Sequence, residues 1–199
     1  MPLAISDQGS GNRIEIDAET METSDGSIVL SGSGNLVSIA HGVSLQNASI
    51  SLGSGCALVI GQDCRVAALE LVAKRSAHVR IGADSNFTWH TRLYLHEPGR
   101  IEIGEHCLIA SDVLMTISDM HSIIDRDTGQ RINPARDIVI GDQVWLAHSV
   151  TVMGGSHVGQ GAIVGLGSVV TGTLENYTLS VGRPARTIRS NVTWDAALR

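Results

Sequence analysis

Apolar residues return at every sixth position along the C-terminal part of the chain. From Ile140 onward these residues are Ile140, Leu146, Val152, Val158, Val164 and Val170. The residue four positions after each of the first five is small or β-branched: Val144, Val150, Ser156, Ala162 and Ser168. An α-helix repeats after about 3.6 residues and a half-buried strand after about two, so neither explains the pattern. The spacing instead predicts a solenoid, in which each repeat adds one short strand and one tight turn around a core.

Upstream, three trios of apolar residues keep the same spacing and are separated by short insertions. The trios are Ile60, Val66, Val72; Ile81, Phe87, Leu93; and Ile103, Ile109, Met115. We expect each trio to point into the core of one triangular coil. Before Ile39 the repeat is looser, and no segment there has a helical pattern. The sequence predicts irregular N-terminal coils over residues 1–38, a hexapeptide-repeat β-helix over 39–182 and a C-terminal tail over 183–199.

The repeat is interrupted between Met115 and Ile140, where a long segment replaces one six-residue step. This segment, residues 118–137, is rich in Asp, Arg, Gly, Asn and Pro, which favour loops. We therefore expect an extended loop that leaves one corner of the solenoid and returns in register. Long loops in compact domains are often functional. His121 lies in this loop, which makes the interruption a candidate site.

The composition agrees with an all-β solenoid that has a thin core. The chain of 199 residues is long enough for one domain, and it contains 22 glycines and only 3% aromatic residues. A β-sandwich would show strict alternation and more aromatic residues. The formal net charge of −6 argues against binding to nucleic acid, which requires clustered basic residues, and against an anionic membrane surface.

No segment approaches the roughly 18 apolar residues of a membrane span, and no basic start followed by an apolar run marks a signal peptide. The three cysteines, Cys56, Cys64 and Cys107, are an odd number without the spacing of a metal site. We expect them to be buried, reduced thiols, which are typical of a reducing compartment. These features predict a cytoplasmic protein.

From about Ile101 to Arg189 the sequence resembles the hexapeptide-repeat acyltransferases. The resemblance lies in the repeated IGxxxx units, in the loop segment DMHSIIDRDTGQRI, in IVIGDQVWLAHSVTV and VGQGAIVGLGSVVT, and in the closing GRPARTIR. It is strongest to the branch that holds maltose, galactoside and antibiotic acetyltransferases and the sugar O-acetyltransferases of surface-polysaccharide synthesis. Upstream of Ile101 only the repeat itself is shared.

The resemblance implies a left-handed parallel β-helix, although crossovers between parallel strands are usually right-handed. It also implies a homotrimer, with acetyl-CoA in a groove between neighbouring subunits. The expected reaction transfers an acetyl group to a hydroxyl of a saccharide acceptor, in the modification of a capsule or lipopolysaccharide. No metal ion is expected to take part.

Acetyl transfer to a hydroxyl requires a base, donors for the oxyanion and a held thioester. The resemblance assigns the base to His121, and an imidazole, which titrates near neutral pH, suits this role. Trp145, in the VW pair, is expected to contribute an indole N–H or a packing surface for a ligand, or else to pack the loop against the coil. Asp119 and Asp125 both lie near His121 in the sequence, and their spacing does not decide whether either orients its ring.

The residues expected to bind acetyl-CoA occur in the last coils and the closing segment. Ala147 is small and should leave its amide accessible, and backbone N–H groups commonly stabilise an oxyanion. The positions expected to line the pantetheine arm are Gly165, Leu166, Ser168 and Thr171. A basic cluster for the phosphates is formed by Arg183, Arg186 and Arg189. Many relatives carry lysine where this chain has Gly172, so Arg183 is a candidate replacement for that contact.

The acceptor site is less defined by the sequence. The residues Trp89, His90, Arg92, Tyr94 and His96 would suit a sugar, with Arg92 meeting a carboxylate, or would form an ordinary surface. A small acceptor such as a free sugar, an antibiotic or an amino acid is an alternative, although the lack of a helical N-terminal domain argues against serine. A zinc enzyme resembling γ-type carbonic anhydrases would need two histidines five apart, and none of the eight histidines form such a pair. A non-catalytic β-helix is the remaining alternative, against which His121 and the arginine cluster argue.

Overall fold

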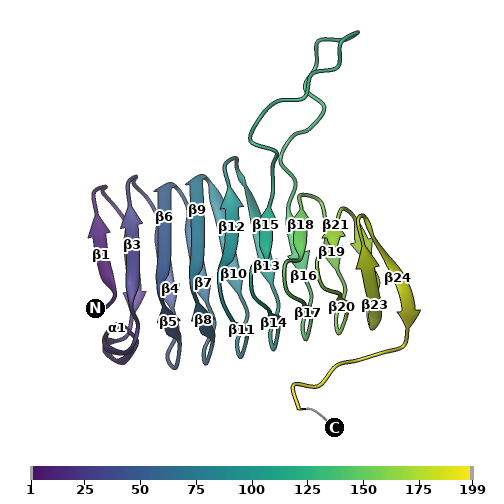
Figure 1. Cartoon of the computed structure of the whole chain (residues 1–199). Helices are drawn as coiled ribbons and strands as arrows, with labels where there is room; N and C mark the ends of the chain where they lie inside the picture. Colours follow the sequence, from purple (N-terminus) through teal and green to yellow (C-terminus); the bar gives the residue numbers. More distant parts are fainter. Residues whose placement is uncertain (1, 198–199) are drawn as a thin grey trace.

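Three sheets wind around one axis and form the body of the protein (Figure 1). The structure, a computed structural model, describes residues 2–197. The first sheet contains β1 (Ala4–Asp7), β3 (Gly26–Leu30), β6 (Ala48–Ser54), β9 (Leu69–Arg75), β12 (Thr91–Leu95), β15 (Leu114–Thr116), β18 (Thr151–Met153) and β21 (Val169–Val170). The second contains β2 (Arg13–Ile16), β4 (Leu36–Ile39), β7 (Ala57–Ile60), β10 (Ala77–Ile81), β13 (Gly99–Ile103), β16 (Ile138–Ile140), β19 (His157–Val158) and β22 (Thr173–Leu174). The third contains β5 (Ser44–Gln46), β8 (Arg65–Ala67), β11 (Asn86–Phe87), β14 (Leu108–Ile109), β17 (Trp145–Leu146), β20 (Ile163–Val164), β23 (Thr178–Gly182) and β24 (Ala185–Ser190).

The chain passes from the first sheet to the second and then to the third, and strands of successive coils pair in parallel. The last pair, β23 with β24, is antiparallel and closes the C-terminal end of the third sheet. The predicted all-β fold is confirmed: it is a left-handed parallel β-helix with one extended loop and a short C-terminal tail.

The six-residue spacing from Ile140 to Val170 is confirmed by burial. Every apolar residue in that series is at most 1% exposed, and every residue four positions later is at most 2% exposed. The prediction for Val72 is wrong, because Leu71 packs into the core and pairs with Leu93 in register. Only Ala68, in the left-handed region at φ 50°, separates β8 from β9, so this corner is shorter than the six-residue step requires.

The N-terminal part contains a helix that the sequence analysis did not predict. Strands β1 to β4 pair in register with the later coils, but α1 (Ala18–Thr23) follows β2. Asp17 caps α1 by accepting the Thr20 N–H at 2.9 Å, and this bond lowers the pKa of Asp17. No helix among residues 2–197 is long and apolar enough to cross a membrane.

The three cysteines are buried and unpaired, as predicted. Burial raises the pKa of each thiol, to about 11 for Cys107. The Cys107 thiol points at the Gly141 carbonyl oxygen of the next coil, 3.2 Å away. These side chains behave as small core residues rather than as nucleophiles or metal ligands.

Two corners of the solenoid position the candidate site. The loop corner joins the first sheet to the second and comprises residues 96–98, 117–137, 154–156 and 171–172. The return corner joins the third sheet to the first and comprises residues 88–90, 110–113, 147–150 and 165–168. The extended loop projects from the loop corner between β15 and β16 (Figure 1). Because three sheets enclose the core, the third sheet lies across the solenoid from the loop corner.

Candidate active site

The extended loop holds His121 outside the solenoid. The loop folds into two legs that meet in a short hairpin, where Ile124 and Arg131 form an isolated antiparallel bridge. His121 lies on the outgoing leg and is exposed. Within residues 2–197, neither of its ring nitrogens has a hydrogen-bond partner. The imidazole is therefore open to a ligand or a partner from outside the chain.

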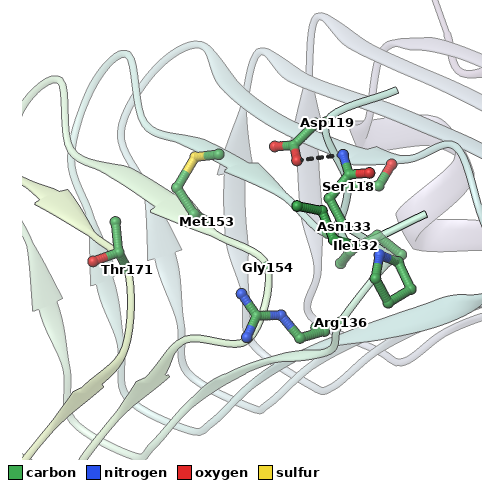
Figure 2. A pocket seen from close by; sticks show the side chains of 10 residues that line it. Ser118, Asp119, Ile132, Asn133, Arg136, Met153, Gly154 and Thr171 are labelled. Carbon is green, nitrogen blue, oxygen red and sulfur yellow. Dashed lines mark hydrogen bonds between the residues drawn. The ribbon is translucent and has the colours of Figure 1, made fainter. Parts of the chain in front are cut away.

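Asn133, on the returning leg, ties the two legs together beside His121. Its Nδ2 donates to Asp119 Oδ2 and to the His121 carbonyl oxygen, both at 2.8 Å. Its Oδ1 accepts the Ile123 N–H at 2.7 Å. Figure 2 shows the bond between Asn133 and Asp119. The His121 backbone is thus held in place while its ring stays free.

Both aspartates near His121 are engaged elsewhere. Asp119 is bound by Asn133, and Asp125 accepts the Thr128 N–H at 2.7 Å and the Thr128 hydroxyl at 2.8 Å. The Thr128 bonds, led by the backbone N–H, lower the pKa of Asp125 and close the turn at the loop tip. Within the described residues, no carboxylate orients the His121 ring.

A cleft of about 400 Å³ opens between the base of the loop and the coils that follow it (Figure 2). Asp119 and Asn133 line its loop side, and Met153 and Thr171 line its solenoid side. Arg136 brings a guanidinium group to the same cleft. Thr171, predicted to contact the cofactor, therefore lies in a cleft that the His121 loop helps to form.

Three other predicted cofactor residues gather at the return corner. Ala147 and Gly165 lie in adjacent coils, and Leu166 is 73% exposed beside Gly165. The Ala147 N–H donates to the Val164 carbonyl oxygen at 2.9 Å. The amide that the sequence analysis expected to be accessible is thus already paired within the ladder of the third sheet.

Ser168 follows this group in the sequence, but its side chain faces inward. It is 1% exposed, and its hydroxyl accepts the Gly182 N–H at 3.0 Å. Ser168 therefore supports the turn between β23 and β24 and does not line the corner.

The three arginines of the closing segment are exposed at and beyond that turn. Arg183 Nε donates to the Gly167 carbonyl oxygen at 2.6 Å, which fixes its guanidinium against the return corner. Arg186 and Arg189 lie on β24, in register with Val181 and Leu179 of β23. The fold thus brings the basic cluster next to Gly165 and Leu166, as a site for a phosphate-bearing ligand would require.

Trp145 lies on β17 in the third sheet and is half-buried. The C-terminal tail brings Trp194 against it, with 6.2 Å between the ring centroids, and the Trp194 indole N–H donates to the Gln143 carbonyl oxygen at 2.7 Å. Because the third sheet lies across the solenoid from the loop corner, a single chain does not bring Trp145 and His121 together.

The predicted acceptor residues fall into two groups. Trp89, which is 50% exposed, and His90 lie at the return corner. His90 Nδ1 lies 2.8 Å from Asp112 Oδ1, and this bond lowers the pKa of Asp112. His148 Nδ1 lies 3.7 Å from the other oxygen of Asp112.

The described part of the chain contains no group of three or more His, Cys, Asp or Glu side chains that could hold a metal ion.

Arg92, Tyr94 and His96 instead lie along β12 and just beyond it. The Tyr94 hydroxyl donates to Glu70 Oε1 at 2.9 Å, and its ring meets His96 edge to face at 5.8 Å. Burial, followed by the nearby positive charge of Lys74, lowers the pKa of His96. Tyr94 thus contacts both Glu70 and His96, whereas Trp89 and His90 lie at the return corner.

Sequence reasoning missed several residues that shape the site. Asn133 and Arg136 lie where the repeat is absent, so no periodicity marks them, and Trp194 follows the last coil. The one available signal was composition, since Asn133 precedes Pro134 in a segment rich in loop-forming residues.

The β-helix and its extended loop define the class of this protein. No protein-family model matches the chain. In both fold and sequence the chain is nevertheless similar to known acetyltransferases, among them a hexapeptide-repeat acetyltransferase.

Three of the similar proteins illustrate this likeness. The polysialic acid O-acetyltransferase of Neisseria meningitidis is 29% identical over 151 residues, which are 75% of this chain and 69% of that protein. The crystal structure of the polysialic acid O-acetyltransferase OatWY matches with a TM-score of 0.93 and 26% identity, covering 98% of this chain and 92% of that one. A hexapeptide-repeat acetyltransferase from Vibrio cholerae, complexed with acetyl coenzyme A, matches with a TM-score of 0.56 and 27% identity over 68% of this chain and 70% of that one.

Proposed function

We propose that this protein transfers the acetyl group of acetyl-CoA to a hydroxyl of a saccharide in a capsule or lipopolysaccharide. The observation that carries the proposal is His121, whose backbone is held by Asn133 and whose ring is free on an extended loop. The match to polysialic acid O-acetyltransferases over nearly the whole chain supports a saccharide acceptor. In this reaction the His121 imidazole accepts the proton of the acceptor hydroxyl.

The residues of the chain fit acetyl-CoA, which when bound supplies an activated acetyl thioester. Ala147 and Gly165 are small, and Leu166 offers an exposed apolar side chain for the pantetheine arm. Arginine forks match phosphate oxygens well, so the closing cluster of Arg183, Arg186 and Arg189 would hold the phosphates. This cluster supplies the local positive charge that an otherwise acidic chain needs for an anionic ligand.

We further propose a homotrimer in which the loop of one copy meets the return corner and third sheet of the next. This arrangement is supported by the separation of His121 from Trp145 in a single chain. It is also supported by four large apolar side chains of the loop that are about half exposed or more: Met120, Ile123, Ile124 and Ile132. Apolar groups gathered in this way commonly mark an interaction surface. Trp145 would then pack against the ligand or loop of a neighbouring copy.

We place the enzyme in the cytoplasm, because its three cysteines are free and buried rather than paired. Secreted proteins commonly use disulfides, whereas reducing compartments keep thiols free.

Saturating acetyl-CoA should raise the melting temperature of the protein. A ligand that binds only the folded state stabilises it by about 2.7 kcal/mol at a hundredfold excess over Kd. The experiment is a thermal melt with and without acetyl-CoA. In the double variant Arg186→Gln/Arg189→Gln, which lacks two of the proposed phosphate contacts, the shift should be smaller. As the control, Arg13→Gln removes an exposed arginine of β2 and should leave the shift intact. An unchanged melting temperature at millimolar acetyl-CoA would contradict the proposed donor.

A further inference from the structure

An ion pair connects the solenoid to the loop that carries His121. Arg131 NH1 and NH2 donate to the two oxygens of Glu97 at 2.6 and 2.7 Å. Glu97 belongs to the loop corner after β12, whereas Arg131 lies in the hairpin of the loop. The Arg131 and Glu97 side chains are 31% and 27% exposed, respectively, which is less than in the other arginine–carboxylate pairs of residues 2–197. The hydrogen bonds from Arg131 lower the pKa of Glu97. A bidentate fork with this burial fixes the direction of the guanidinium.

The same guanidinium also holds Asn133. Arg131 Nε donates to Asn133 Oδ1 at 3.2 Å, and Arg131 NH2 donates to the Asn133 carbonyl oxygen at 2.8 Å. The side-chain amide of Asn133 therefore accepts two hydrogen bonds, from Arg131 and Ile123, and donates two, to Asp119 and His121. This is the full capacity of an asparagine side chain.

These contacts form one continuous chain of hydrogen bonds from the rigid solenoid to the His121 backbone. We propose that Glu97, Arg131 and Asn133 are positioning residues that set the place of His121 for acetyl transfer. The proposal rests on the proposed function, and none of the three is assigned contact with a substrate. Displacing a reacting group by about 1 Å can lower the rate by about a hundredfold, so the network would act on turnover rather than on binding.

The alternative is that the ion pair only anchors the loop, and a second arginine offers a matched control. Arg100 Nε lies 3.0 Å from Asp137 Oδ2 at the returning end of the same loop, without a link to His121. Glu97→Gln, Arg131→Lys and Asn133→Asp should each lower kcat by about tenfold to a hundredfold. Their KM values for donor and acceptor and their melting temperatures should stay unchanged. Arg100→Gln should keep wild-type kcat.

A charge swap separates the ion pair from the contacts to Asn133. Glu97→Arg/Arg131→Glu can restore the ion pair, but a glutamate at position 131 has no N–H to give to Asn133. The double variant should therefore recover the anchoring of the loop, but its kcat should remain as low as in the single variants. Wild-type kcat in Glu97→Gln and Arg131→Lys would overturn the proposal, and so would an equal loss in Arg100→Gln.

Hydrogen exchange tests the network without catalysis. In Glu97→Gln, amides of residues 118–124 should exchange faster than in wild type. The largest change should occur at the Ile123 N–H, which donates a hydrogen bond to Asn133 Oδ1. Unchanged exchange in that segment would overturn the positioning network. If Glu97→Gln shows this faster exchange but the wild-type protein has no transferase activity, the proposed function alone is refuted.

Discussion

Replacing His121 with alanine should lower kcat by about 10²- to 10⁴-fold, the usual contribution of a positioned acid–base group. The imidazole is exposed, and no hydrogen bond within residues 2–197 engages its ring, so its removal costs the fold little. Asn133 binds the backbone of residue 121 rather than its side chain, and the loop should keep its shape. The loss should therefore appear in turnover, with the melting temperature and the affinity for acetyl-CoA unchanged.

The measurement is steady-state release of coenzyme A thiol by purified His121→Ala, with acetyl-CoA affinity determined separately. His41→Ala is the matched control, because His41 is also an exposed histidine but lies between β4 and β5, away from both the loop and return corners. Near-wild-type turnover in His121→Ala would rule out this residue as the base. A loss of turnover in His41→Ala would show that the assay reports general damage.

Replacing Phe87 with alanine should lower the free energy of unfolding by about 3–5 kcal/mol, a large effect for a single side chain. Phe87 is the only phenylalanine in the chain and is 1% exposed in the core. It lies in register between Val66 of the coil before and Ile109 of the coil after. Each coil of a solenoid packs only on its neighbours, so a cavity at Phe87 weakens both interfaces.

Chemical denaturation of Phe87→Ala checks this expectation, and Phe87→Leu is its matched control. Leucine keeps most of the apolar volume, so its cost should stay below about 1.5 kcal/mol. Equal stabilities for the alanine and leucine variants would contradict the packing described for this layer.

The repeat made most of the fold predictable because one physical requirement, an inward side chain on each short strand, recurs along the chain. It failed where local geometry changes the count. Val72 was assigned to the core because spacing alone cannot reveal that the corner at Ala68 is short. The helix α1 was missed because six residues give too little periodicity, although Asp17 is a residue type favoured at the N-cap of a helix.

The candidate site was predictable only in part. His121 could be singled out as a candidate because the repeat stops around it, and the arginines because their charge clusters in an acidic chain. Asn133 is hydrogen-bonded to the other leg of the loop, and Arg131 to Glu97 of the solenoid, and such pairings leave no pattern in a single sequence. The pairing of the Ala147 amide, similarly, depends on the neighbouring coil rather than on the size of its own side chain.

The proposed reaction can be tested by measuring acetyl transfer by the wild-type protein from acetyl-CoA to a defined saccharide. The experiment follows thiol release and the mass of the saccharide, with polysialic acid and a panel of capsular and lipopolysaccharide glycans as acceptors. We expect thiol release that depends on the saccharide and a product heavier by one acetyl group for each thiol released. Binding of acetyl-CoA without transfer to any glycan, together with rapid acetylation of a small non-saccharide acceptor, would contradict it.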